Sequence, residues 1–209
     1  MAKEKKENKE EKITKQQPKT KKKTVDKWKK KTWYTIVAPQ EFEAKEIGET
    51  IVEKAENLMG RIISVSGRDL ANQPKKQHIH IRFKVINIVG NKAHTDAIGH
   101  MIKDNYMKRV VRRKSSKIMI VKDYPSSDGI KFKIKTIIVT EKKASGNQKA
   151  GLMKKTDEMM KDIISKISSR KIVDELVFGT IPNKIYPQLK KIVPVKRIEI
   201  TNSEIIASK

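Results

Sequence analysis

The clearest pattern along the chain is an alternation of polar and apolar positions between residues 77 and 89. The polar members are His78, His80, Arg82 and Lys84, and the apolar members are Ile79, Ile81, Phe83 and Val85. Successive side chains of a strand point to opposite faces, so the pattern predicts a long strand with one buried face and one wet, basic face. Gly90-Asn91 indicates a hairpin turn, followed by a return strand over residues 92–99.

A second alternation spans residues 131–140, where Lys131, Lys133 and Lys135 alternate with Phe132 and Ile134. We expect the two lysine-bearing faces to form one continuous positive surface. An alternative interpretation is that these lysines only discourage edge-to-edge pairing of strands. Shorter strands are expected at residues 33–37, 61–66, 117–121 and 192–200.

Residues 103–117 predict a basic helix set between strands. Tyr106, Met107, Val110 and Val111 fall on one side at 3.6 residues per turn, and Asp104 stands where an N-cap belongs. The cations of this segment are Lys103, Lys108, Arg109, Arg112, Arg113, Lys114 and Lys117. Such a face suits a polyanion, although a merely solvated charged face is the alternative.

From residue 151 the apolar period becomes helical, which predicts a helix to residue 170 and short helices at 172–178 and 183–189. Residues 141–150 predict a polar loop. Because strands precede helices and the connections are short, we expect an α+β fold. Its sheet should be antiparallel, twisted and barrel-like, with the basic helix inserted and the C-terminal helices packed on it.

The expected organisation is a disordered basic N-terminal arm at residues 1–27, one globular domain at residues 28–200, and a frayed tail at residues 201–209. The arm carries too few apolar residues to offset its ordering entropy. Its densest knot contains Lys21, Lys22 and Lys23. We expect this arm to fold onto phosphate, the alternative being a solubilising tail without defined contacts.

Composition strengthens the polyanion interpretation. The 209 residues include 49 Lys and Arg against 24 Asp and Glu, a net charge of +25. A nucleic acid is the usual partner for such a charge, and no amphipathic helix with a bulky aromatic face favours the competing membrane surface. Without cysteine, a signal-like apolar start or a long apolar run, we expect a soluble cytoplasmic protein.

Candidate chemistry is weak. His78 and His80 share a strand face, which suits metal ligands, but no third ligand is indicated and the surrounding charge is positive. The segment GNQKAGLMKKT has the two-glycine spacing of a phosphate loop, yet Leu152 stands where the phosphate-binding lysine belongs. Carboxylates are too sparse for a two-metal nuclease. We therefore predict no enzyme, no catalytic or metal-binding residue and no cofactor.

One stretch resembles a known family. KKTWYTIVAPQEFEAKEIGET, at residues 30–50, is similar to the opening of a small-subunit ribosomal protein family shared by archaea and eukaryotes, the S-three-A-e family. Matching positions there are Lys30, Lys31, Trp33, Tyr34, Ala38, Pro39, Phe42, Ile47, Gly48 and Thr50. Weaker blocks follow in order over residues 28–200, including Val110-Val111-Arg112-Arg113 and Val195-Lys196-Arg197-Ile198.

The resemblance implies a structural protein of the small ribosomal subunit, on its platform near the messenger exit. Implied partners are small-subunit ribosomal RNA and neighbouring ribosomal proteins, with initiation factors and messenger RNA as further candidates, and no membrane. The alternatives are a free RNA-binding regulator or chaperone, and an RNA-processing enzyme. The expected RNA-binding residues are Lys103, Lys108, Arg109, Arg112, Arg113, Lys114, Lys117, Arg82, Lys84, Lys131, Lys133, Lys21, Lys22, Lys23, Lys30 and Lys31.

Overall fold

A computed structural model describes residues 27–71, 73–178 and 180–206. Lys31–Lys209 form one compact unit, and the unit before it is described only in the 3-10 turn η1 (Lys27–Lys30). The expected arm, with Lys21, Lys22 and Lys23, therefore lies outside the described residues, apart from its last position. Within the described ranges, no helix is long and apolar enough to cross a membrane.

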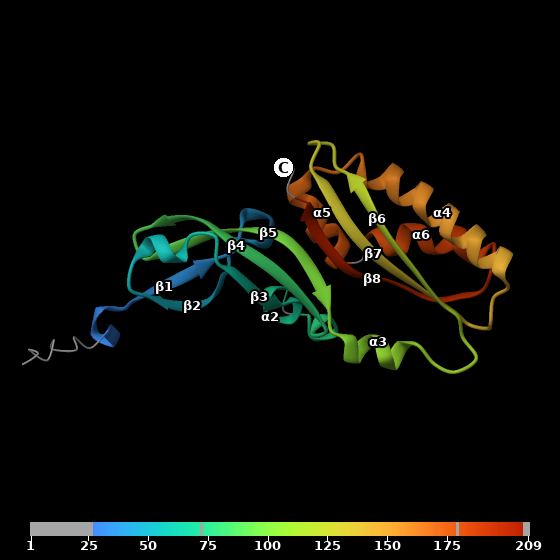
Figure 1. Ribbon diagram of the computed structural model, residues 1–209, viewed down its shortest axis with the longest axis horizontal. Coiled ribbons are helices and arrows are strands. Elements are labelled where there is room, and N and C mark those ends of the chain that lie inside the picture. The colour runs from blue at the N-terminus through green and yellow to red at the C-terminus, as the bar shows by residue number, and fades with distance from the viewer. Residues whose placement is uncertain (1–26, 72, 179, 207–209) are drawn as a thin grey trace, which may run out of the picture. The chain divides into compact units, whose positions relative to one another are not determined.

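Eight strands of the described chain form one sheet (Figure 1). They are β1 (Thr32–Val37), β2 (Glu46–Val52), β3 (Ile62–Ser66), β4 (Ile79–Val89), β5 (Lys92–Ile102), β6 (Lys117–Pro125), β7 (Lys131–Thr140) and β8 (Val195–Ile206). The strand order is β2-β1-β5-β8-β7-β6, with β4 paired along β5 and β3 paired to β4. One strand, β5, thus joins the N-terminal strands to the C-terminal ones.

Our prediction of an antiparallel, barrel-like sheet was wrong on two points. β1 runs parallel to β5 where Thr35, Ile36 and Val37 pair with residues 92–94, so the sheet is mixed. The sheet is also open, because β2 and β6 stand at opposite ends of the strand order and do not pair. The parallel pair arises because β2, β3 and β4 intervene in sequence between β1 and β5, a crossover that local patterning does not reveal.

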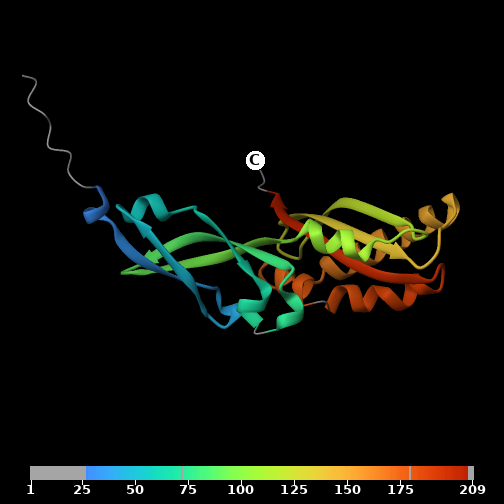
Figure 2. The same ribbon diagram turned by 90° about the horizontal axis from the view of Figure 1, so that it is seen from below.

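Helices cover one part of the sheet, as the α+β prediction required. They are α4 (Gly146–Ile164), α5 (Ser169–Val177) and α6 (Thr180–Lys190), in addition to the short α2 (Gly67–Ala71) and α3 (Asp104–Val110). α4 packs on β6, α6 on β8, and α5 on β5 and β8 (Figures 1 and 2). Phe132 and Ile134 of β7 are buried in one core with Leu152 and Met160 of α4.

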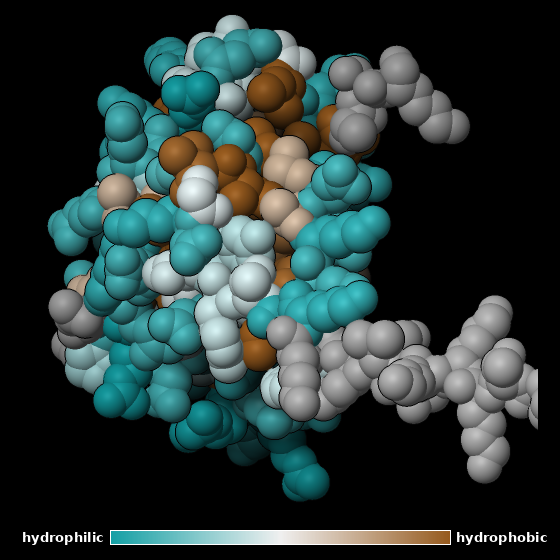
Figure 3. Space-filling model, turned by 90° about the vertical axis from the view of Figure 1, so that its left-hand side faces the viewer, coloured by the Kyte–Doolittle hydropathy of each residue, from teal (hydrophilic) through white to brown (hydrophobic). Residues whose placement is uncertain are grey.

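A second, smaller apolar cluster lies in the N-terminal part of the sheet. Val52, Leu58, Val85 and Ala93 are buried there, contributed by β2, the 3-10 turn η3 (Ala55–Leu58), β4 and β5. Figure 3 shows a face of the molecule on which hydrophobic side chains lie among hydrophilic ones. Four buried side chains make a thin core, so this region depends on pairing with β5 as well as on burial.

Several expected boundaries were wrong. The basic helix ends at Val110, and Lys103 rather than Asp104 holds the N-cap position, without a side-chain bond. The expected loop at residues 141–150 contains the first turn of α4, which begins at Gly146. The expected frayed tail is part of β8 as far as Ile206, because residues 202–206 pair with β7.

Candidate nucleic-acid interface

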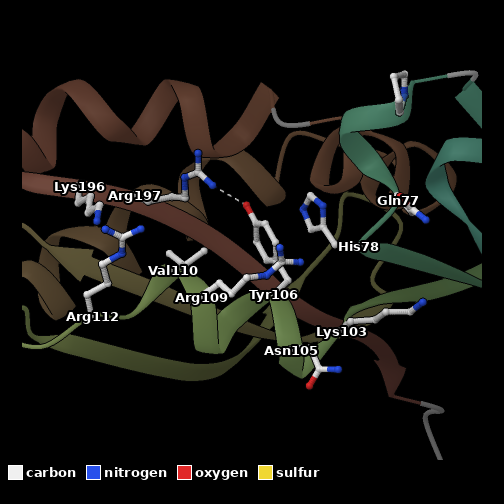
Figure 4. A pocket seen from close by; sticks show the side chains of 11 residues that line it. Gln77, His78, Lys103, Asn105, Tyr106, Arg109, Val110, Arg112, Lys196 and Arg197 are labelled. Atoms are coloured by element: carbon white, nitrogen blue, oxygen red, sulfur yellow. Dashed lines mark hydrogen bonds between the residues drawn. The ribbon is translucent and has the colours of Figure 1, made fainter.

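A concave surface lined by several cations lies beside α3. A pocket of about 760 Å³ is bounded there by α3, the segment before β4 and the start of β8 (Figure 4). Its lining residues are Pro74, Gln77, His78, Lys103, Asn105, Tyr106, Arg109, Val110, Arg112, Lys196 and Arg197. Five of these are cationic and none is acidic. We call this surface the α3 groove.

Tyr106 fixes α3 to the two strands that complete the groove. Its ring stacks on the His78 ring, with the centroids 3.7 Å apart and an interplanar angle of 14°. The Tyr106 hydroxyl donates to Glu199 Oε1 at 3.0 Å and accepts from Arg197 Nη1 at 2.5 Å. The backbone N–H of Lys103 donates to the His78 carbonyl at 2.9 Å. These contacts hold residues 103–106 against both β4 and β8.

Glu199, the acid that is hydrogen-bonded to Tyr106, does not line the groove. Burial raises the pKa of the Glu199 carboxyl, although the Tyr106 hydroxyl and the Arg197 charge oppose that shift. Burial, followed by the nearby Glu199 charge, raises the pKa of Tyr106. Arg197 Nη1 lies 3.7 Å from Glu199 Oε1, so Glu199 partly neutralises this one groove cation.

The other four groove cations carry unneutralised charge. Lys103, Arg109, Arg112 and Lys196 are all exposed, and none forms an ion pair with an acid in the described ranges. Like charges gathered around one concavity focus the field into it. The α3 groove is therefore suited to an extended polyanion, whose charges can meet several of these cations, more than to a single small anion.

Three of the sixteen expected RNA-binding residues meet in this groove, namely Lys103, Arg109 and Arg112. The other cations of the segment are exposed but do not line it; they are Lys108, Arg113, Lys114 and Lys117. Because α3 ends at Val110, Arg112 and Lys114 belong to the loop before β6, and Lys114 takes a left-handed φ of 67°. The short helix spreads these charges over helix and loop instead of one helical face.

The strand cations are arranged differently from our expectation. Arg82 Nη2 lies 2.9 Å from Glu204 Oε1, and the pair is partly buried. The pairing register puts Arg82, Gly99, Glu204, Lys133 and Asp123 in one row across five strands. Acids and bases alternate along this row. The interpretation of one continuous positive surface was therefore wrong here, because partner strands supply acids that the separate strands do not show.

The remaining expected residues lie apart from the groove. Lys84 lines a different pocket of about 450 Å³, and Lys131 is exposed at the start of β7. Lys30 is exposed in η1, and Lys31 is half-buried and already has an interaction partner.

Sequence reasoning missed several residues of the groove. Lys196 and Arg197 of β8 were noted only as part of a family signature, and Tyr106 only as an apolar position. His78 was noted as a member of a wet, basic strand face and as a metal candidate, but not among the expected RNA-binding residues. Their shared location depends on β8 returning beside α3 after more than 80 residues. The adjacent Lys196-Arg197 pair at the start of the last strand was a local signal for the groove.

Fold and groove together define a basic α+β protein equipped to hold a polyanion. Residues 19–209 match the Ribosomal S3Ae family, and the chain belongs to this family of structural ribosomal proteins, not of enzymes. The resemblance inferred from residues 28–200 is thereby confirmed.

Archaeal relatives match over most of their length. The chain is 36% identical over 181 residues to small ribosomal subunit protein eS1 of Methanococcus vannielii, covering 87% of this chain and 82% of that protein. It is 34% identical over 192 residues to the protein of the same name from Methanobrevibacter smithii, covering 90% and 97%. The protein of that name from Methanocaldococcus jannaschii is 34% identical over 185 residues.

Proposed function

We propose that this chain is a structural constituent of the small ribosomal subunit, and that the α3 groove is part of the surface with which it binds ribosomal RNA. The observation that carries the proposal is the convergence of five cations, from α3, the following loop and β8, on a concavity lined by no acid. The relatives named as small-subunit proteins support the ribosomal assignment.

The electrostatic argument favours RNA over a small anion. Duplex backbones present one phosphate charge about every 1.7 Å, so a run of phosphates can meet several groove cations at once. Lys108, Arg113, Lys114 and Lys117 are also exposed, in the last turn of α3 and in the residues that follow it. In this proposal they contact flanking phosphates, as does the N-terminal arm with Lys21, Lys22 and Lys23.

The finer assignment rests on the family resemblance. In this proposal the protein lies on the platform of the cytoplasmic small subunit near the messenger exit, beside neighbouring ribosomal proteins. Initiation factors and messenger RNA are further partners in this proposal. A side-chain-resolution density map of the small subunit would test each of these contacts directly.

Salt dependence tests the RNA-binding proposal. The affinity of the full chain for a small-subunit ribosomal RNA fragment should fall on the order of a thousandfold between 50 and 200 mM salt if six or more phosphates are neutralised. Titrations of labelled RNA at several salt concentrations give the slope. A flat response would contradict the proposal.

A free RNA-binding regulator is the competing function, and sedimentation of a lysate separates the two. A ribosomal constituent follows the small subunit into the heavy fractions. A regulator or chaperone stays mainly in the light fractions, and that distribution would overturn the ribosomal assignment.

A further inference from the structure

Cations alone do not account for the composition of the α3 groove. A surface that only neutralises a backbone needs Lys and Arg, yet this one also presents two aromatic rings, His78 and Tyr106. The rings are stacked nearly parallel, 3.7 Å apart. Both rings are half-buried and line the groove.

Stacked aromatic rings flanked by cations are the usual platform for unpaired bases. Every nucleobase has a π-face that can extend such a stack, whereas bases in a duplex are already stacked on each other. The amide side chains of Gln77 and Asn105 are exposed at the same groove and can hydrogen-bond a base edge (Figure 4). A volume of about 760 Å³ falls within the range of small-molecule sites, so it can accommodate a nucleotide.

The stacked His78–Tyr106 ring pair is held rigidly, which favours stacking of a base on it. The Tyr106 hydroxyl is bonded to both Glu199 and Arg197, and the backbone of His78 is bonded to Lys103. A base that stacks on prearranged rings does not have to order them first.

We propose that the α3 groove holds an unpaired ribonucleotide of RNA, with its base stacked on the His78–Tyr106 pair and its flanking phosphates on Arg109, Arg112 and Lys196. This inference rests on the proposed function and adds a preference for single-stranded RNA. The site would bind an RNA strand where that strand leaves an RNA helix or forms a bulge.

The test compares three probes with the full chain: a labelled single-stranded RNA 12-mer, a duplex of the same length, and inorganic polyphosphate. His78→Ala should weaken single-strand binding on the order of tenfold, the effect of losing one stacked base. It should change polyphosphate binding less than twofold, because the five groove cations are all retained. His78→Phe should restore the single-strand affinity, since it restores an aromatic face.

Matched variants separate stacking from charge and from misfolding. His94→Ala removes an exposed histidine of β5 outside the groove and should leave all three affinities unchanged. Arg109→Gln should weaken all three probes, and more strongly than Arg68→Gln, which removes an equal charge from α2 away from the groove. Unchanged melting temperatures show that each variant is folded.

The outcomes distinguish the two proposals. If His78→Ala binds single strands as wild type does while Arg109→Gln is impaired, the nucleotide site is refuted and the RNA-binding function survives. Equal loss with His78→Ala and His78→Phe also refutes stacking. If Arg109→Gln and Arg68→Gln behave alike and the salt response is flat, the proposed function fails as well.

Discussion

Gly99 is one of the three β5 residues that pair with β8 and so join the two halves of the sheet. It pairs with Arg82 of β4 on one side and with Glu204 of β8 on the other. A Cβ built on Gly99 would lie 1.9 Å from the Ser203 carbonyl oxygen, and its φ of 155° is one that other residues rarely adopt. A bare backbone here lets β8 approach β5, and β8 in turn carries Lys196 and Arg197 to the groove.

Gly99→Ala should therefore destabilise the protein by about 2–6 kcal/mol, the sum of backbone strain and overpacking. Urea unfolding followed by circular dichroism measures the change. Gly48→Ala is the matched control, because a Cβ at Gly48 in β2 meets no atom within 4 Å. Similar losses for the two variants would contradict the steric argument.

His100, the next residue of β5, is buried as a neutral ring. Its backbone N–H donates to Ser203 Oγ at 3.0 Å, its Nδ1 lies 2.7 Å from the same hydroxyl, and its Nε2 lies 2.8 Å from the Ile200 carbonyl oxygen. A carbonyl only accepts, so Nε2 carries the proton and Nδ1 accepts from Ser203. Burial lowers the pKa of His100 to about 4, and the Arg82 charge acts in the same direction.

The sign of the resulting pH dependence follows from linkage. The unfolded chain binds a proton at His100 near pH 6.5, whereas the folded protein resists protonation until about pH 4. The stability contribution is therefore complete above pH 6.5 and is lost as the pH falls to 4, by about 3 kcal/mol. Denaturant unfolding between pH 7 and pH 4 should show this loss in wild type and not in His100→Gln.

An exposed histidine provides the reference for that experiment. His94→Gln is the matched variant, because it makes the same substitution at a histidine of β5 that is exposed and lies outside the hydrogen bonds to Ser203 and Ile200. If His100→Gln also kept the full profile, another group would be responsible for it.

The elements that the sequence predicted well are those with a long, regular period. β4 shows the expected alternation, with Ile79, Ile81, Phe83 and Val85 buried and their neighbours more exposed. The helical period after residue 151 likewise marks α4, whose Leu152, Thr156, Met160 and Ile164 are buried at every fourth position. Burial of one face of a strand or helix imposes these periods, so they can be recognised in the sequence without knowing which element packs against that face.

The elements that the sequence predicted poorly have local signals that neighbouring residues typical of loops outweighed. α4 begins with a capping box in which Ser145 Oγ accepts from the Gln148 N–H and Gln148 Oε1 accepts from the Ser145 N–H. The Ser-x-x-Gln spacing was present, but Gly146 and Asn147 favoured a loop. β2 was missed because its burial pattern is irregular and Gly48 interrupts it.

The α3 groove was predictable only in part, for a related reason. The segment 103–117 was correctly singled out as basic, but the groove also needs His78 and Lys196, which approach Tyr106 only through tertiary structure. Some side chains contribute to a site through contacts with residues far away in sequence. Such side chains produce no periodic pattern in the sequence around them. Arg82 is the opposite case. From the sequence its charge was expected to bind RNA, but in the folded protein it is paired with Glu204 of β8.

The whole chain carries more positive charge than its own acids can neutralise. With 49 Lys and Arg against 24 Asp and Glu, about half of the cations must be solvated or paired with an external anion. Self-repulsion of a net charge of +25 destabilises the folded state relative to one with its charges neutralised. In the proposed complex, RNA would also relieve the repulsion among the cations that folding brings together.

Binding should consequently raise the melting temperature of the full chain. A ribosomal RNA fragment at 100 times its dissociation constant stabilises the fold by about 2.7 kcal/mol by mass action, which corresponds to roughly 5–10 °C for a chain of this size. Differential scanning fluorimetry with and without RNA, in the same buffer, measures the shift. Raising the salt should shrink the RNA-dependent shift while stabilising the RNA-free protein, since salt weakens binding and screens self-repulsion alike. Equal midpoints with and without RNA at low salt would show that the fold does not depend on its counter-charge.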